Sequence, residues 1–460
     1  MTSRSPFQRA RRKTLFTATA LVAVASVLAA ACSDDDKAET TTSAAAETTA
    51  APETTAAPET TAAGTETTAA GTETTAAPSG CPGGTPAGDP LNTWVVSTVD
   101  SSVQSYPNIK AAAEIYEKYI NDCGGIAGRP LKVTFCDGKT DPNEDAACAR
   151  KAVDDGAIAL VGGYDTDVSL LIGVLEEAGT AWFGACCPVV AKEFASPIAF
   201  NMGSVFSFNP GAAARMVADG CTNSSFLVGD NATGEYFKSQ AKTALEKLGY
   251  TGKANYVTVP LATTDYSSVA AKATEGGVDC VHGFMGDIQW LGIIPAMEAL
   301  GAKPRLYGPQ GNLNVKVAEA FPEATEGAVV IGTYPNIDSP VWEAYRGALV
   351  KYEAPDLDWN SLAGLGTWAA FEGFRLIVEG MVAAGVTDIN NKTFADAAGK
   401  TTALDTKGMV GVIDFTKQWD GEGGAFPRIF NRNVFHDCVS GGKLAPCAEP
   451  GPFDASPYHA

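Results

Sequence analysis

The chain has 460 residues, enough for two or three domains, and a formal net charge of −20. A surface this acidic argues against nucleic-acid binding, because contacts with phosphates require basic patches. Only three histidines are present, so a histidine-rich metal site is not expected. No zinc spacing, phosphate loop or nucleophile elbow occurs, and we therefore expect no metal, no cofactor and no enzyme activity.

The first 32 residues have the pattern of an export signal. A basic start that includes Arg11 and Arg12 precedes an apolar run over 15–31, which is too short for a strong membrane-spanning helix. Residues 28–32 (Leu-Ala-Ala-Ala-Cys) resemble a bacterial lipoprotein signal, in which Cys32 receives the lipid, although Ala29 stands where leucine is usual. The alternative is an ordinary secretory signal with a spare cysteine, and the twin-arginine route of export also stays open.

A low-complexity segment follows the signal. Residues 33–80 repeat Glu-Thr-Thr-Ala-Ala with proline or glycine spacers, a composition that cannot bury a core. We expect 33–87 to be a disordered linker with a typical reach of about 40 Å. Such a linker suits a domain held away from the surface of the cytoplasmic membrane.

From residue 94 the chain alternates short β-branched runs with helical apolar spacing, which predicts a parallel sheet with right-handed crossovers. Ligands of such sheets lie beyond the carboxyl ends of the strands, here near 100–106 and 162–167. The predicted strands are 94–99, 131–135, 157–161, 180–184 and 198–202, and the predicted helices between them are 108–120, 145–154 and 168–178.

The segment 204–210 is interpreted as a crossing into a second lobe of the same kind. The chain is expected to return near 334–335, to form helices over 340–352 and 362–384, and to end in a short β tail at 412–415 and 428–430. The predicted strands of the second lobe are 225–228, 254–259, 278–282, 305–307 and 328–332, with helices over 234–248, 267–275, 290–300 and 315–321.

Ten cysteines follow Cys32, and export makes disulfides plausible; an even count fits five bridges. Sequence alone does not fix the connectivity. The adjacent Cys186 and Cys187 form either a strained vicinal bond or bonds to other cysteines. The favoured pairs are Cys136–Cys148, Cys438–Cys447, Cys221–Cys280 and Cys81–Cys123.

The order of the pieces resembles the type I periplasmic binding proteins, in the branch that binds branched-chain amino acids for ABC importers. Six segments between residues 88 and 436 carry the resemblance. They are Asn-Asp-Cys-Gly-Gly-Ile-Ala-Gly-Arg-Pro at 121–130, Asp-Pro at 141–142, Asp-Asp-Gly-Ala-Ile-Ala-Leu-Val-Gly at 154–162, Gly-Pro-Gln-Gly-Asn-Leu-Asn-Val at 308–315, Trp-Ala-Ala-Phe-Glu-Gly-Phe at 368–374 and Gly-Val-Ile-Asp-Phe at 411–415.

The resemblance implies an α/β fold of two Rossmann-like lobes with parallel sheets, joined by a multi-strand hinge. The N-terminal lobe would comprise 88–205 and about 336–415, and the C-terminal lobe 206–335 and about 416–460. It also implies a monomeric, lipid-anchored, extracytoplasmic protein that captures a small solute and delivers it to an ABC permease. The alternative is a sensor of the same fold that signals to a membrane partner.

Carried over position by position, the resemblance places Tyr106 across the ligand, and Asp165 with Thr166 where a hydroxyl holds the ligand carboxylate. Cys186 and Cys187 fall in a loop that does the same with backbone amides. The second lobe would contribute three residues, of which Gln310 stands where an acid pairs with the ligand ammonium. These three are Thr233, Asp287 and Gln310.

The departures from the family pattern bear on the ligand. Gln310 is neutral and Asp165 adds negative charge beside the carboxylate position, so a zwitterionic amino acid lacks its partners. We therefore expect an amide, urea-like, polyol or aromatic ligand, unless Asp287 replaces the missing acid. Each residue also has a structural alternative: Tyr106 can pack at a helix start, and Asp165 can cap a helix.

Overall fold

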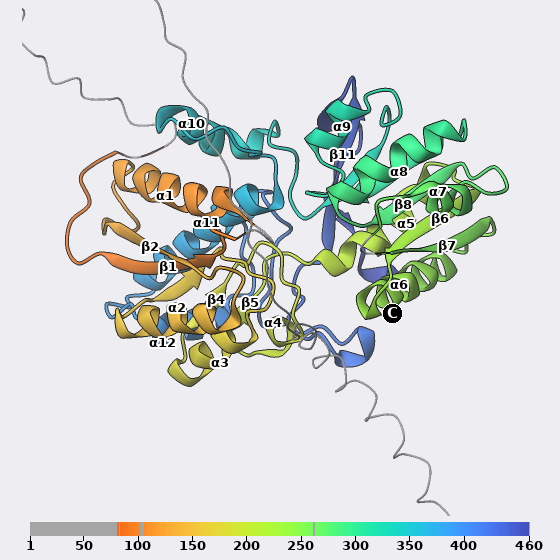
Figure 1. Cartoon of the computed structure of the whole chain (residues 1–460). Helices are drawn as coiled ribbons and strands as arrows, with labels where there is room; N and C mark the ends of the chain where they lie inside the picture. The colour runs from red at the N-terminus through yellow and green to blue at the C-terminus, as the bar shows by residue number, and fades with distance from the viewer. Residues whose placement is uncertain (1–80, 82, 102–104, 261–262, 460) are drawn as a thin grey trace, which may run out of the picture. The chain divides into compact units, whose positions relative to one another are not determined.

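The computed structural model describes residues 81–459 except 82, 102–104, 261 and 262 (Figure 1). The predicted signal, the predicted lipid site at Cys32 and the repeats over 33–80 lie outside the described residues. Within the described part the chain forms two lobes, each built on its own sheet.

The first sheet has the strand order β2-β1-β3-β4-β5, and all of its pairs are parallel. Its interior strand β1 is buried along almost its whole length, as expected for a parallel strand with helices on both faces. The strands are β1 (Leu91–Ser97), β2 (Leu131–Asp137), β3 (Ala159–Val161), β4 (Ala181–Phe183) and β5 (Ala199–Phe200).

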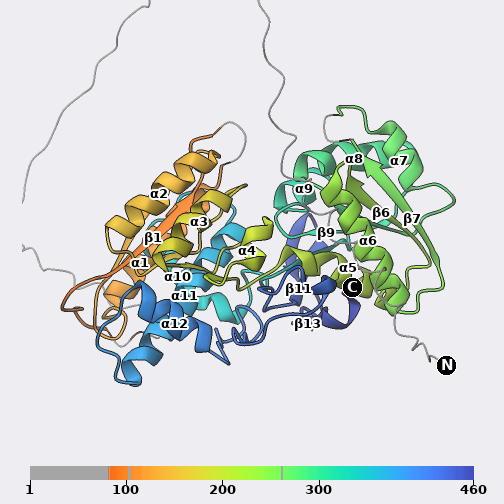
Figure 2. The same ribbon diagram turned by 90° about the horizontal axis from the view of Figure 1, so that it is seen from below.

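Helices cover both faces of this sheet (Figure 2). α1, α10, α11 and α12 share a core with Val95 and Phe183, whereas α2 and α3 pack against Trp94 and Trp182 on the other face. The helices are α1 (Pro107–Asp122), α2 (Pro142–Asp154), α3 (Ser169–Ala178), α4 (Ala191–Ala195), α10 (Glu343–Lys351, after the 3-10 turn Pro340–Trp342), α11 (Leu362–Ala383) and α12 (Asn391–Lys400).

The second sheet has the order β7-β6-β8-β9-β10-β11-β12, with β13 paired to β11. β6 to β10 run parallel, and β11 joins β10 antiparallel. The strands are β6 (Asn223–Gly229), β7 (Lys253–Val259), β8 (Cys280–Phe284), β9 (Arg305–Pro309), β10 (Val329–Gly332), β11 (Asn433–Ser440), β12 (Lys443–Pro446) and β13 (Phe453–Asp454).

α7, α8 and α9 lie on one face of the second sheet, and α5 and α6 lie on the other (Figure 2). Side-chain caps set several helix starts: Asn231 accepts from the Gly234 amide (2.7 Å) at α6, and Asn314 from the Val317 amide (3.2 Å) at α9. The helices are α5 (Phe208–Ala218), α6 (Ala232–Lys247), α7 (Ser267–Ala273), α8 (Asp287–Ala299) and α9 (Val315–Ala320), with 3-10 turns at Val205–Ser207, Glu422–Gly424 and Ser456–Tyr458.

The prediction of two α/β lobes with parallel sheets is therefore confirmed. The chain passes between the sheets after β5, after β10 and before β11. The lobe boundaries expected near 205, 335 and 415 stay proposed boundaries.

The predicted strands of the tail are wrong. Residues 412–415 contribute only an isolated bridge between Leu404 and Ile413. Residues 428–430 are held by side-chain bonds instead of a ladder, because the buried Arg428 guanidinium donates to the carbonyl oxygens of Ala199 (2.8 Å) and Pro197 (3.0 Å). The β tail begins later, at β11, where a His-Asp-Cys run interrupts the apolar alternation that predicts a strand.

The structure contains disulfides between Cys81 and Cys123, Cys136 and Cys148, Cys221 and Cys280, and Cys438 and Cys447, the four favoured pairs. The expected fifth bridge is absent among the described cysteines, because Cys186 and Cys187 are both free.

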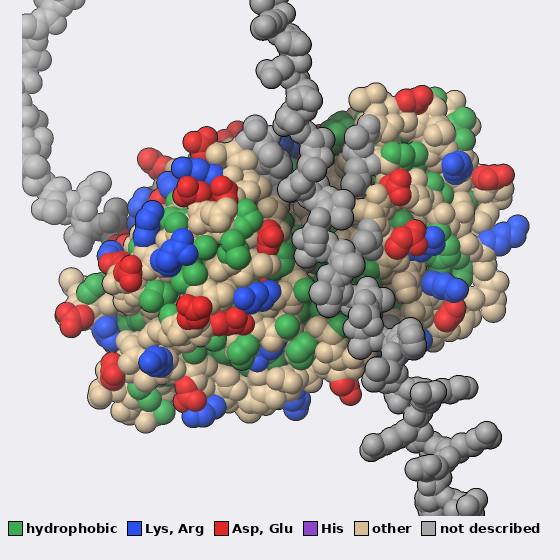
Figure 3. All heavy atoms as spheres, turned by 60° about the horizontal axis from the view of Figure 1, so that its bottom comes forward, with side chains coloured by type: hydrophobic (Ala, Val, Ile, Leu, Met, Phe, Trp, Pro, Cys, Tyr) green, Lys and Arg blue, Asp and Glu red, His purple; other side chains and the backbone are tan. Residues whose placement is uncertain are grey.

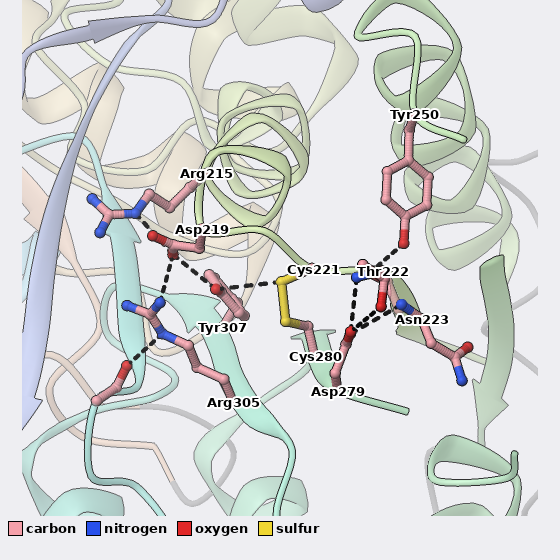
Figure 4. The surroundings of a disulfide bond; sticks show 12 residues. Arg215, Asp219, Cys221, Thr222, Asn223, Tyr250, Asp279, Cys280, Arg305 and Tyr307 are labelled. Carbon is pink, nitrogen blue, oxygen red and sulfur yellow. Dashed lines mark hydrogen bonds and ion pairs between the residues drawn. A yellow bond between two sulfur atoms is a disulfide. The ribbon is translucent and has the colours of Figure 1, made fainter. Parts of the chain in front are cut away.

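The Cys221–Cys280 bond joins the amino-terminal ends of the neighbouring strands β6 and β8 (Figure 4). Beside it, Asp219 accepts from Arg215 (2.9 Å) and from the Tyr307 hydroxyl (2.8 Å). Cys221, Cys280 and Asp279 have the spacing of metal ligands, but the two sulfurs are bonded to each other and offer no thiolate. None of the helices over the described residues combines the length and apolarity needed to cross a bilayer.

Candidate functional site

The carboxyl ends of β1, β3 and β4 bring together an aromatic and thiol-lined surface on the first lobe. The Tyr106 amide donates to Thr98 just after β1 (2.7 Å), and the Tyr164 amide donates to Val96 (3.0 Å). The two phenol rings meet edge to face with their centroids 5.0 Å apart. Cys186 and Cys187 follow β4 and lie close enough to influence both tyrosines electrostatically.

Tyr106, Tyr164 and Cys186 are neutral at physiological pH. Burial, and then the neighbouring thiols, raise the pKa of the Tyr106 phenol, and burial likewise raises the pKa of the Tyr164 phenol. Burial and the hydrogen bond to Cys187 raise the pKa of the Cys186 thiol. The surface therefore offers hydroxyl and thiol groups together with aromatic faces.

Two glycines allow this surface to form. Gly184 directly follows β4, and its φ of +67° lies in the left-handed region that favours glycine. A Cβ at this position would lie 2.5 Å from the Ala370 Cβ, which is too close. A Cβ at Gly366, on α11, would lie 2.7 Å from the Cys186 Cβ and 2.8 Å from the Tyr334 hydroxyl. That hydroxyl is buried and has no hydrogen-bond partner within the described structure. Tyr334, which follows β10, thus joins the thiol-lined surface from the second passage of the chain.

A pair of carboxylates lies at the same edge of the first sheet. Asp165 accepts from the Thr98 hydroxyl and from the Thr166 amide (2.7 Å), and it is 2% exposed. Asp145, near the start of α2, is 1% exposed, and its Oδ1 has no hydrogen-bond partner. A Cβ at Gly138 would overlap Asp145 Oδ1 and lie 2.8 Å from Asp165 Oδ2, so the two carboxyl groups lie near each other.

Burial, and then the charge of Asp165, raise the pKa of Asp145 to about 8. Asp167, Asp141 and Asp137 act in the same direction. This edge of the first lobe is therefore an environment of negative potential, in which at least one carboxyl group keeps its proton at neutral pH.

Gln310 lies at the end of β9 with both ends of its amide facing backbone groups. Its Nε2 donates to the Tyr334 carbonyl (3.4 Å), and its Oε1 accepts from the Tyr334 amide (3.4 Å). The side chain is buried and joins the ends of β9 and β10 at the second passage. Its predicted contact with the ligand stays a prediction.

The second lobe has a cavity of about 130 Å³ at the carboxyl ends of its strands. Its walls are apolar, with the rings of Phe237 and Phe284 only 3.9 Å apart, and its polar groups come from amide and hydroxyl side chains. The lining side chains that project into this space include Asn231, Thr233, Phe237, Phe284, Met285 and Gln289.

Asp287 stands beside this cavity without lining it. It opens α8, its Oδ1 accepts from the Ile288 amide (2.9 Å), and its Oδ2 accepts weakly from Asn314 (3.4 Å). Asp287 is partly exposed, and its neighbours in sequence Gly286 and Gln289 line the cavity.

The predicted site residues thus fall into groups. Tyr106, Asp165, Cys186 and Cys187 cluster on the first lobe, with Thr166 next to Asp165. Thr233 lines the cavity of the second lobe, and Asp287 and Gln310 lie at neighbouring strand ends. Sequence reasoning missed Tyr164, Tyr334, Phe237, Phe284 and Gln289. Tyr164 stood inside the expected carboxyl-end segment 162–167, whereas the phenylalanines gave no signal beyond ordinary core periodicity.

A buried serine–histidine pair lies elsewhere, near the first passage. Ser207 Oγ is 3.3 Å from His459 Nε2, and Glu422 is 3.5 Å from His459 Nδ1. Ser207 is fully buried in the core, so no substrate reaches its hydroxyl. These residues pack the C-terminal end of the chain against α5 and do not form an open nucleophilic site.

The sequence matches the model of the family described as "Periplasmic binding protein" over residues 95–425. A leucine-, isoleucine-, valine-, threonine- and alanine-binding protein of Pseudomonas aeruginosa is 23% identical over 346 residues, which span 72% of this chain and 90% of the relative. It is named as a binding protein and not as an enzyme.

Solved structures share the fold. A solute-binding protein of an ABC transporter from Rhodopseudomonas palustris HaA2, in complex with p-hydroxybenzoic acid, aligns with a TM-score of 0.63 at 21% identity, over 80% of this chain and 98% of that one. A fatty acid ABC transporter substrate-binding protein from Thermomonospora curvata aligns with a TM-score of 0.60 at 15% identity, over 82% and 97% of the two chains.

Proposed function

Because the chain belongs to the periplasmic-binding-protein family, we propose that it is an extracytoplasmic solute-binding protein that delivers a small ligand to an ABC importer. The carboxyl ends of two parallel sheets are where such a fold holds ligands. The thiol-lined surface of the first lobe and the cavity of the second supply aromatic faces with a few hydrogen-bonding groups, as small-molecule sites do.

We propose that the ligand is neutral, with an aromatic or amide-like group. The observation that supports this is the buried pair Asp145 and Asp165, because the family resemblance would put a ligand carboxylate beside Asp165. The relatives are named for amino acids, a hydroxybenzoic acid and a fatty acid, all of which carry a carboxyl group. An anion beside this pair would be repelled, and an unpaired buried charge costs several kcal/mol.

The proposal also covers the membrane anchor, the linker and the partners of the protein. Cys32 is the proposed lipid site, and the repeats would hold the lobes, working as a monomer, away from the membrane. On the face in Figure 3, acidic and basic side chains are interspersed over both lobes. Together with the net charge of −20, this supports a small solute and a permease as partners in preference to nucleic acid.

A thermal-shift screen of the purified protein against a solute panel tests the function. A ligand at a hundredfold excess over its Kd adds about 2.7 kcal/mol of stability, and we expect neutral aromatic amides and related compounds among the hits. Titration calorimetry with leucine, isoleucine and valine tests the ligand class. Micromolar binding of any of the three would contradict the neutral class and leave the solute-binding function standing. A panel without hits would contradict the function itself.

A further inference from the structure

The two cysteines of the thiol-lined surface have no other partner. The eight other cysteines of the described chain are joined in four disulfides, and Cys186 and Cys187 are both free. An exported chain that forms four bonds meets an oxidising environment, in which free thiols do not persist unless they are protected. The remaining pair is adjacent in sequence, so among the ten described cysteines its members can bond only to each other.

The local structure holds the two thiols together. Cys186 and Cys187 form a bend after β4, and both pack into the core cluster that contains Tyr106 and Tyr164. Glu193 fixes the loop that follows: its Oε2 accepts from the amides of Val189 (2.8 Å) and Val190 (3.0 Å), and its Oε1 accepts from the Trp182 indole (3.0 Å). Cys187 is partly exposed, so an oxidant can reach one of the two sulfurs.

We propose that Cys186 and Cys187 are a redox modification site, at which a vicinal disulfide stiffens the first-lobe face of the ligand site. The inference rests on the proposed function for the identity of that site. The oxidant is a disulfide-bearing thiol oxidoreductase or a small disulfide. The Cys187 thiolate attacks the donor disulfide and releases one donor thiol, and the Cys186 thiolate then displaces the second. The protein pair loses two electrons and two protons, and the donor disulfide becomes two thiols.

The proposed vicinal disulfide should be reduced more readily than the four other disulfides, because it is strained. Adjacent Cα atoms are about 3.8 Å apart across a trans peptide, shorter than the usual separation of about 4.4–6.8 Å in disulfides. A strained disulfide is reduced more readily than a relaxed one. Closing the ring also replaces two S–H groups by an apolar sulfur pair in the core cluster that contains Tyr106 and Tyr164.

Alkylation followed by mass spectrometry tests the bond. The exported protein is purified without reductant, unfolded in the presence of iodoacetamide and digested. Without reductant, we expect the peptide that contains Cys186 and Cys187 to carry no adduct. In a series of increasingly reducing glutathione buffers, this peptide should gain two adducts at a less reducing potential than any other cysteine peptide. Cys187→Ser is the matched control and should give one adduct in the unreduced protein. Two adducts on the unreduced wild-type peptide would overturn the proposal.

Hydrogen exchange tests the effect on the site. Amides of residues 164–167 and 184–190 should exchange at least fivefold more slowly in the oxidised than in the selectively reduced protein. The double variant Cys186→Ser, Cys187→Ser should show no such response, which excludes effects through the other disulfides. Equal exchange in both states would contradict the stiffening. Neither readout uses a ligand, so both remain decisive if the solute screen fails.

Discussion

Three buried carboxyl groups, those of Asp145, Glu193 and Asp437, each lie in surroundings that favour the protonated form. Burial raises the pKa of Asp145 to about 8, of Glu193 to about 7 and of Asp437 to about 6. Asp437, in β11, accepts from the amides of Asn336 (2.8 Å) and Asn360 (3.2 Å), but these bonds offset only part of the cost of burial. Each group binds its proton more tightly in the folded than in the unfolded chain.

The first prediction is that the protein is more stable near pH 5 than near pH 8.5. The unfolded carboxyls lose their protons near pH 4, whereas the folded ones retain them up to about pH 6, 7 and 8. The stabilisation is therefore complete below about pH 4 and is lost as the pH rises through those values. Burial lowers the pKa of His282 and His436 to about 4, so these two groups destabilise the fold near pH 5 and offset part of the carboxyl effect. Urea unfolding should show a net decrease in stability from pH 5 to pH 8.5, smaller than the carboxyl groups alone would give.

Asp145→Asn is the control for this pH dependence, because an amide replaces the protonated carboxyl without a titratable group. The variant should match the wild type near pH 5 and exceed it near pH 8.5. A wild-type stability that rises between these pH values would contradict the prediction.

The second prediction concerns Glu193, which positions the loop after β4. Glu193→Ala leaves the Trp182 indole and the amides of Val189 and Val190 without their acceptor. Unsatisfied buried donors cost about 1–3 kcal/mol each, so we expect a loss of at least about 2 kcal/mol in the free energy of unfolding. Glu193→Gln keeps one acceptor oxygen and should lose less, and equal losses in the two variants would argue against this hydrogen-bond role. Denaturant unfolding at pH 8 measures both.

At the scale of elements, the alternation of strands and helices was predictable. The short apolar runs typical of buried strands and the helical spacing of apolar residues are both clear in this chain. β6, for example, is buried over most of its length, and α1 begins at Pro107 with apolar residues at helical spacing. The tail was not predictable in the same way. β11 carries buried His436 and Asp437 in its centre, and the buried Arg428 replaces a ladder by side-chain bonds, so tertiary contacts decide both segments.

The third prediction compares two disulfides by the length of the chain they close. Cys221 and Cys280 are 59 residues apart, and Cys438 and Cys447 only 9 apart. The chain-entropy relation gives about 4 kcal/mol for the longer loop and about 3 kcal/mol for the shorter. Replacing both Cys221 and Cys280 by alanine should therefore lower the free energy of unfolding more than replacing both Cys438 and Cys447 by alanine. Denaturant midpoints measure the difference, and the reverse order would contradict an entropic origin.

The fourth prediction uses two glycines of α11. Gly366 faces Cys186 and Tyr334, and an added Cβ has no room there, so Gly366→Ala should destabilise by about 1–3 kcal/mol and disturb the thiol-lined surface. Gly380 is exposed, with open space around its Cβ position. Gly380→Ala should stabilise the same helix by about 0.5–1 kcal/mol. Thermal unfolding distinguishes them, and a tolerated Gly366→Ala would mean that the surface is loosely packed.

For the whole molecule, topology predicted which edges of the two sheets bear the candidate site, because the carboxyl ends of parallel strands gather polar loops. That rule located Tyr106, Asp165 and Thr166. It could not supply Tyr334, which reaches the first lobe from the second passage, nor the cavity side chains Phe237 and Phe284, whose positions depend on packing between elements distant in sequence.

The fifth prediction is that a ligand acts on both lobes at once. Hinge closure around a solute should lower the radius of gyration measured by X-ray scattering, with a matching rise in Tm. Thr233→Trp is the test variant: Thr233 is exposed and lines the 130 Å³ cavity, so an indole there should fill the cavity and leave the fold intact. The variant should keep the Tm of the free wild type and lose both responses to a solute that shifts the wild type. If it retains them, the ligand does not use the second lobe, and the two edges form separate surfaces in place of one closing site.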